Sequence, residues 1–534
     1  MSNTYNIYKV RSNKLDPLLE KVRTVGLVEQ KTVNSIQYRM TFYFSEEIVG
    51  NDIWWWSTYR DFFCDHVTKP QNKFFFGLLL CTRIDNENEV FAVSLGKSHF
   101  YLSKFIELDF GINLAIRMAD EDTILLKKSR YFSGAKRQEI SSYENFTKDS
   151  YDPGESVEHL KLKASNKEMW GDKNIIFADS IQMDIDKSPT QLEEIFNYIN
   201  DSLADEAVIN LPKLEAVSEE EIITNLDSIL FTSITEGIAH VAVEEFRVYG
   251  INICFNFHEY NYQLSFKSKR KTICRKDIGN TLEVSYLRDF IKENQNIDNV
   301  NNLKVQFKRE DSGVFSKSIK EVIDFYVEYE GYNYFLKHGE WYKFNQTFMD
   351  YLKKSLESIS ITQMIPLDES EYIAWRDEKE QRIGQGELVD DKITYREYFF
   401  NKKLSQEHGY ELMDRQLTEI ERINDKKKKY KLEIADLYKD NEIISVKISK
   451  DSHELIYNIE QSKDSIELIM QRAIPFDNEL KYAALWFVFE NDVKKITDIH
   501  SIQFLLAIEA WQQRIKYHKL LPRIYISKHI KPKG

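Results

Sequence analysis

Residues 431–449 read KLEIADLYKDNEIISVKIS, and polar and apolar residues alternate on both sides of the pair Asp440-Asn441. An Asp-Asn pair between two alternating runs favours a two-residue turn. The pattern therefore predicts a hairpin in which Lys439 pairs with Glu442.

The same register places Asp436 opposite Ser445 and Ile434 opposite Lys447. Asp436, Ser445 and Lys447 then share one face of the hairpin. The other face is apolar and suited to packing on a core, and it carries Ala435, Leu437, Ile444, Val446 and Ile448. Diagonal neighbours across two strands lie roughly 7–8 Å apart, which leaves room for a metal ion or a phosphate between Asp436 and Lys447.

Helices are predicted on both sides of this hairpin. Thr394 and Glu397 have the spacing of a capping box for a helix that reaches about Gln406, and a strand is expected over 410–417. Asp451 and Glu454 form a second capping box after the hairpin. The predicted order is helix, strand, hairpin, helix.

This arrangement resembles the active-site hairpin of the PD-(D/E)XK nucleases, in which an aspartate ends one strand and an acidic-x-lysine pattern ends the next. The resemblance implies that Asp436 binds Mg²⁺ against a phosphodiester, and that Lys447 orients water and stabilises phosphoryl charge. The sequence departs from the pattern at Ser445, which occupies the acidic position.

A second carboxylate would then have to come from elsewhere in the chain. The candidates are Glu397, Glu411, Asp414, Glu433 and Glu454. Two of them, Glu397 and Glu454, are interpreted as capping residues. We assign Glu433 as the second catalytic and metal-binding residue, although strand parity turns it to the opposite face. The alternative is an amphipathic hairpin whose solvated face carries an ion pair.

Several short motifs occur in an order that is similar to a sporadically distributed bacterial family of unknown function. They are Asp109-Phe110-Gly111, Phe177-Ala178-Asp179-Ser180, the segments 336–342, 409–414 and 433–437, and Ser445-Val446-Lys447. The family hairpin usually reads histidine-valine-lysine, followed by serines and a helix with a glutamine. This resemblance implies nucleic-acid contacts by Ser445, Ser449 and Gln461. The family's patchy distribution implies a role in phage defence.

The length of 534 residues predicts several domains, because single cores rarely grow beyond about 250–300 residues. We expect an α+β protein with β-rich mixed domains over 1–210 and 211–385. An α/β restriction-endonuclease-like core is expected over 386–534, after a polar linker at 377–391. The pattern of residues 334–342 predicts a hairpin. A helix capped by Asn345 is expected after it.

The net charge of −13 argues against a surface that binds nucleic acid everywhere. A local basic segment runs from 511 to 534, with seven basic residues and no acidic one. It is interpreted either as a solvated surface helix and tail or as a phosphate-binding segment, with Arg514, Lys516 and Arg523 as its contacts.

The N-terminus lacks the apolar run of a signal peptide, and no stretch is apolar enough to span a membrane. We therefore expect a cytoplasmic protein without membrane contact. The leading hypothesis is a Mg²⁺-dependent nuclease or nuclease-like effector acting on nucleic acid. The alternative is a non-enzymatic module that binds nucleic acid or protein on a degenerate nuclease core.

Overall fold

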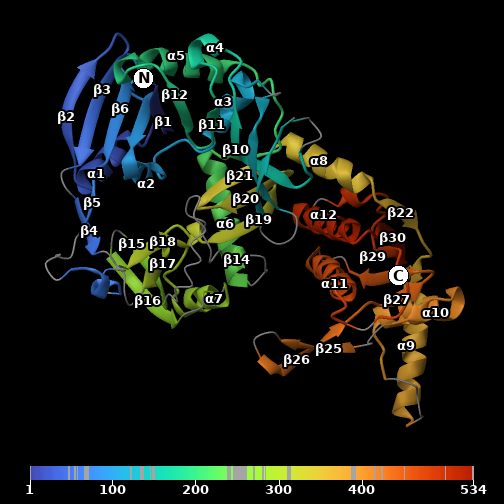
Figure 1. Cartoon of the computed structure of the whole chain (residues 1–534). Coiled ribbons are helices and arrows are strands. Elements are labelled where there is room, and N and C mark those ends of the chain that lie inside the picture. Colours follow the sequence, from blue (N-terminus) through green and yellow to red (C-terminus); the bar gives the residue numbers. More distant parts are fainter. Residues whose placement is uncertain are drawn as a thin grey trace. The chain divides into compact units, whose positions relative to one another are not determined.

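The computed structural model separates into two compact units, and each is described here by itself (Figure 1). One unit comprises Met1–Arg130, Arg137–Tyr151 and Ser156–Lys213, and the other comprises Tyr131–Lys136, Asp152–Glu155 and Leu214–Gly534. The structure describes residues 2–45, 48–52, 56, 58–64, 71–120, 123–132, 137–144, 146, 151–236, 242–243, 261–268, 271–279, 282, 284–308, 314–386, 392–413, 417–422, 425–449, 452–474, 476–499 and 501–531.

The N-terminal unit is built on one antiparallel sheet. Its strand order is β2 (Leu27–Asn34), β3 (Tyr38–Ser45), β6 (Gly77–Arg83), β7 (Val90–Leu95), β1 (Asn3–Val10), β12 (Ile181–Ile185), β11 (Ile175–Phe177), β10 (Glu155–Leu162), β8 (Leu126–Tyr131) and β9 (Arg137–Ser142). A separate hairpin joins β4 (Ile48–Asp52) to β5 (Gln71–Phe74). The helices are α1 (Leu15–Thr24), α2 (His99–Leu102), α3 (Phe110–Met118), α4 (Lys167–Trp170) and α5 (Leu192–Ala204).

Two of the short motifs meet at the start of α3. The backbone N–H of Asp109 donates to the carboxylate of Asp179 over 2.8 Å, and Ile112 N–H donates to Ala178 C=O over 3.2 Å. Gly111 lies so close that a Cβ there would be 2.4 Å from the Ser180 carbonyl oxygen. Only glycine fits this contact, so these motifs serve the packing of α3 on the sheet.

The first part of the second unit contains two antiparallel sheets. One has the order β13 (Leu214–Ala216), β21 (Glu340–Phe344), β20 (Tyr332–Lys337), β19 (Ile323–Tyr329) and β14 (Ala242–Val243). The other has the order β16 (Lys271–Gly279), β15 (Asn261–Ser268), β17 (Leu303–Lys308) and β18 (Phe315–Ser318). The helices here are α6 (Glu220–Glu236), α7 (Val284–Glu293) and α8 (Gln346–Glu357).

The predicted hairpin and helix of this part are confirmed. β20 and β21 pair from Tyr334–Lys343 to Lys337–Glu340, and the Asn345 side chain accepts the N–H of Phe348 over 2.9 Å at the start of α8. Trp341 on this hairpin is buried, and its indole N–H donates to the buried carboxylate of Asp227 over 2.8 Å.

The C-terminal part is a mixed sheet between two pairs of helices. Its strand order is β22 (Ser360–Gln363), β30 (Leu521–Ile530), β29 (Tyr482–Phe489), β28 (Glu442–Ile448), β27 (Leu437–Lys439) and β24 (Glu411–Leu412), with β23 (Leu367–Asp368) also beside β30. The four strands from β22 to β28 are parallel, and β27 and β24 are antiparallel additions.

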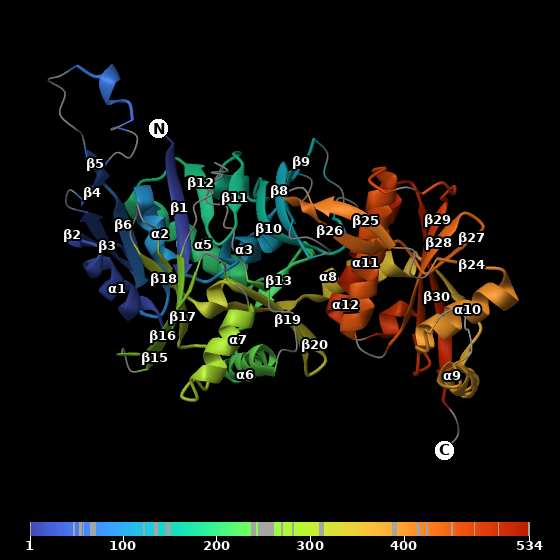
Figure 2. The same cartoon turned by 90° about the horizontal axis from the view of Figure 1, so that it is seen from below.

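The helices cover both faces of this sheet (Figure 2). Helices α9 (Glu369–Gly384) and α10 (Arg396–His408) pack on the face that carries Leu437, Ile444, Val446 and Trp486. Helices α11 (Ser452–Met470) and α12 (Ile502–Tyr517) lie on the opposite face, where Phe504 contacts Phe487. This sheet positions the candidate site.

The α+β prediction is confirmed, whereas the closer expectation of a restriction-endonuclease-like core stays a prediction, as do the domain limits. The C-terminal sheet takes strands from before residue 386, because β22 and β23 pair with β30. The expected linker is wrong over 377–384, which form the second half of α9, while 387–391 lie outside the described residues. Among the helices of the described ranges, none has the length and apolar character needed to cross a membrane.

The basic segment does not form a tail. Residues up to Tyr517 complete α12, and Leu521–Ile530 form β30, which lies between β29 and β22 inside the sheet. The tail interpretation is therefore wrong for 521–530, because residues of this strand such as Ile524 and Ile526 are buried. The end of α12 does have an exposed side, which carries Arg514, Lys516 and Tyr517. Deleting this segment would remove a strand from the interior of the sheet.

We predict that Gly111→Ala destabilises the protein, because the new methyl group would clash with the backbone of residues 178–180. Overpacking of this kind costs about 1–3 kcal/mol of unfolding free energy. Denaturant unfolding of the full chain checks this. Gly384→Ala is the control, since nothing lies within 4 Å of its added Cβ and alanine favours helix α9. Equal stability of the two variants would contradict the packing role.

Candidate functional site

The hairpin forms with the predicted turn but with a shorter first strand. Lys439 pairs with Glu442, as predicted, and the ladder ends at the pair Leu437–Ile444. The predicted pairing of Ile434 with Lys447 is wrong, because the first strand begins only at Leu437 and residues 434–436 lie outside any strand. Residues 425–433 form β26, which pairs with β25 (Leu417–Arg422). Of the strand expected at 410–417, residues 411–412 form β24 and Leu417 begins β25, while 414–416 lie outside the described residues.

Strand β28 consequently extends beyond its neighbour β27. Side chains take the place of the missing strand: the carboxylate of Asp436 accepts the N–H of Val446 over 2.7 Å, and the carboxylate of Glu397 accepts the N–H of Ile448 over 3.2 Å. The side-chain amide of Asn458 donates to the Val446 carbonyl over 3.3 Å. Backbone groups inside a protein need such partners, so this strand end collects polar side chains.

These side chains surround a cavity of about 230 Å³. It is lined by Glu397, Ile434, Ala435, Asp436, Ser445, Lys447, Tyr457, Asn458 and Gln461. The structure thus brings together Asp436, Ser445, Lys447 and Gln461, which the sequence singled out. Whether they act on nucleic acid stays a prediction.

Glu397, which the sequence pattern suggested as a helix-capping residue, lines the cavity. Helix α10 has Tyr395 as its N-cap, without a side-chain capping bond, so the expected capping box from Thr394 is wrong. The Glu397 carboxylate lies 3.4 Å from the ammonium of Lys447, and both side chains are 24% exposed. No local pattern distinguishes this role, because a glutamate in the first turn of a helix is ordinary.

Of the other predicted residues, Ser449 is absent from the described lining of the cavity. Ser449 follows the end of β28, and Glu433 ends β26 with a side chain that lies outside the described part of the chain. The assignment of Glu433 as a metal ligand stays a prediction. Asp451, the expected N-cap of the helix after the hairpin, also lies outside the described residues.

The three basic candidates each contact a neighbouring protein group. Arg514 forms an ion pair with Glu467 at 3.2 Å, and Lys516 donates to Gln512 over 2.9 Å. Arg523 lies 3.5 Å from Glu442 and over the ring of Tyr482, also at 3.5 Å. Burial raises the pKa of Glu442, which lies at the other end of β28 from the cavity. Phosphate binding by Arg514, Lys516 and Arg523 stays a prediction.

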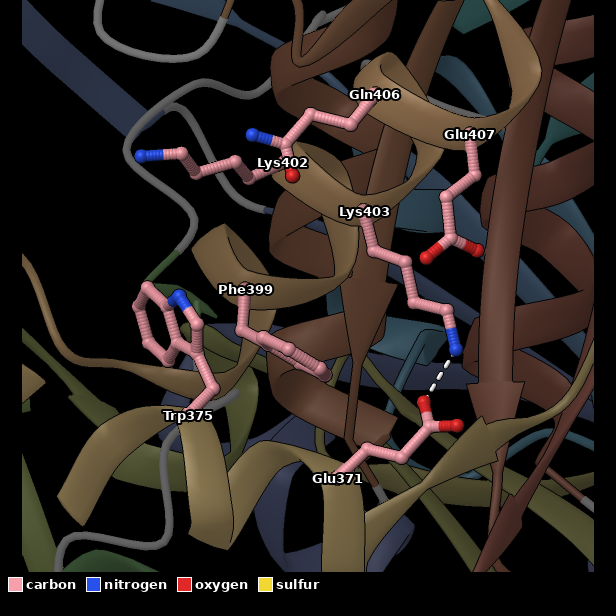
Figure 3. Close-up of a pocket in the computed structure, with 7 residues that line it drawn as sticks. All are labelled: Glu371, Trp375, Phe399, Lys402, Lys403, Gln406 and Glu407. Atoms are coloured by element: carbon pink, nitrogen blue, oxygen red, sulfur yellow. Dashed lines mark hydrogen bonds and ion pairs between the residues drawn. The ribbon is translucent and has the colours of Figure 1, made fainter. Parts of the chain in front are cut away.

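A second pocket, of about 240 Å³, lies between α9 and α10 (Figure 3). Trp375 and Phe399 line it with ring centroids 5.2 Å apart, and Lys403 pairs with Glu371. Its other lining residues are Lys402, Gln406 and Glu407. The lining carries two lysines and two glutamates, so the pocket has no net charge that would favour an anion or a cation.

The cavity beside β28 offers oxygens that suit a divalent cation. Within the described residues, no three His, Cys, Asp or Glu side chains gather as a metal cluster. The cavity instead combines the two carboxylates of Asp436 and Glu397 with the amides of Asn458 and Gln461. Magnesium in proteins is usually bound by one or two carboxylates together with water and substrate phosphates. The residues present therefore fit Mg²⁺.

The model of a family described as a family of unknown function (DUF6119) matches residues 5–493. No curated protein and no solved structure matches the chain.

We predict that Asp436→Ala exposes the strand end, because the N–H of Val446 loses its acceptor. An unpaired buried donor costs about 1–3 kcal/mol. Asp436→Asn should retain most of this stability, since an amide oxygen still accepts. Amide hydrogen exchange at Val446 checks this: the alanine variant should exchange faster, and protection equal to that of the wild type would contradict the assigned bond.

Proposed function

We propose that this chain, which belongs to the family of unknown function, cleaves phosphodiester bonds of nucleic acid with Mg²⁺. The observation that carries this proposal is that one strand end holds two carboxylates and a lysine around a single cavity.

The spacing of the two carboxylates supports this chemistry. Asp436 and Glu397 are anchored to N–H groups two residues apart on β28, at Val446 and Ile448. A strand rises about 3.3 Å per residue, so the anchoring groups lie about 6.6 Å apart. Lys447 lies between them in sequence and is 3.4 Å from Glu397. Two carboxylates anchored this close together on one strand edge can reach a shared small cation.

Each residue has a distinct role in the proposed reaction. Asp436 and Glu397 hold Mg²⁺, which when bound polarises the phosphate and activates water. Lys447 supplies positive charge to the phosphoryl oxygens and helps to orient the attacking water. Glu397 replaces Glu433 in our assignment, because it lines the cavity and contacts Lys447.

The wider expectations belong to the same proposal. The order of α10, the β27–β28 hairpin, α11 and β29 supports a relation to the PD-(D/E)XK nuclease core. We propose that the nuclease acts in the cytoplasm against phage nucleic acid, as the family resemblance implied.

A second candidate function is a non-enzymatic module that binds nucleic acid. Ser445 at the acidic position favours it, because this position of β28 supplies no carboxylate to a metal ion. Such a module would bind phosphate groups through Lys447 without cleaving them.

We predict that the full chain cleaves labelled DNA or RNA with Mg²⁺ but not with EDTA. Glu397→Gln, Asp436→Asn and Lys447→Ala should each lower the rate by at least about a hundredfold, because each removes charge from the reacting centre. A panel of single- and double-stranded substrates, followed by gel electrophoresis, measures this. Thermal melting of each variant separates lost chemistry from lost fold.

The matched controls are Lys402→Ala and Glu407→Gln on the same helix as Glu397, since both line the other pocket. They should cleave as the wild type does. Cleavage by all three cavity variants at the wild-type rate would contradict the site. Binding that depends on Lys447, without cleavage of any substrate, would favour the second candidate function.

A further inference from the structure

Asn458 on α11 is a buried cavity residue with a hydrogen-bonding group left over. Its side chain is 7% exposed, and its Nδ2 donates to the carbonyl of Val446 over 3.3 Å. Its Oδ1 is closed off from solvent and accepts no hydrogen bond from any residue that the structure describes. Buried polar atoms nearly always have a partner, and the described residues supply none to this oxygen, which leaves a water molecule or a cation to fill that place.

The orientation of the amide follows from its neighbour. A carbonyl accepts hydrogen bonds and cannot donate them, so the NH₂ group of Asn458 must face Val446 and the oxygen must face elsewhere. The N–H of the same Val446 holds Asp436. In an extended strand the N–H and C=O of one residue point to the same side, so Asp436 and Asn458 are anchored next to each other.

The chemistry of this oxygen selects its ligand. An amide oxygen needs a hydrogen-bond donor or a cation, and the oxygens of a phosphodiester provide neither. Hard divalent cations such as Mg²⁺ and Mn²⁺ take carboxylate and carbonyl oxygens together. We propose that Asn458 supplies a third protein oxygen, beside Asp436 and Glu397, to a divalent cation in this cavity. This inference rests on the metal site of the proposed function.

Two substitutions separate a metal ligand from a structural hydrogen bond. Asn458→Leu removes both the Nδ2 donor and the Oδ1 acceptor, whereas Asn458→Asp removes the donor and keeps an oxygen at the same place. Binding of Mn²⁺ to the full chain, without nucleic acid, is measured by electron paramagnetic resonance. Loss of groups that support a bound metal costs about 10–100-fold in affinity. We expect Asn458→Leu to bind at least about tenfold more weakly and Asn458→Asp to bind at least as tightly as the wild type.

Each possible result of these measurements either supports or contradicts Asn458 as a metal ligand. If Asn458→Leu binds Mn²⁺ as tightly as the wild type, the inference is wrong. An equal loss of Mn²⁺ affinity in both variants would also contradict it, because the variants share only the loss of the Nδ2 donor. A wild type that does not bind Mn²⁺ would overturn the inference together with the metal site. Mn²⁺ binding as expected, but without cleavage of any nucleic acid, would support the cation site and overturn only the proposed nuclease. Circular dichroism melting confirms that the variants fold.

Discussion

The candidate site depends on one constraint: β28 continues past the end of β27, and its exposed backbone edge must find other partners. Three side chains fill that need from three separate elements: Asp436 from the turn before β27, Glu397 from α10 and Asn458 from α11. Satisfying backbone groups is obligatory in a protein interior. Polar residues therefore converge at this point without any further requirement.

The apolar residues of the same strand make the arrangement rigid. Ile444 and Val446 are fully buried beneath α9 and α10, together with Leu437 of β27. Because successive strand residues point to opposite faces, this packing directs Ser445 and Lys447 toward α11 and the cavity. A site held by a central strand and two helices is well suited to chemistry, which requires fixed positions.

The sequence predicted those features that depend on near neighbours. The turn at Asp440-Asn441 follows from that residue pair, and the apolar face of the hairpin follows from the two-residue period of strands. The convergence of Asp436 with Lys447 was predicted from the same hairpin, and both line the cavity. The role of Glu397 was missed because its partner Ile448 lies 51 residues away, and the local pattern suited a helix cap equally well. Neither interpretation of the basic segment included the strand at 521–530, because this strand pairs with β29 and β22, both distant in sequence.

A crystal structure of the full chain soaked in Mn²⁺, with anomalous diffraction data, tests most directly whether this strand end forms a cation site. We expect an anomalous peak in the cavity, with oxygens of Asp436, Glu397 and Asn458 within about 2.5 Å of the ion. A cavity without such a peak at saturating Mn²⁺, or a peak bound by other residues, would contradict it.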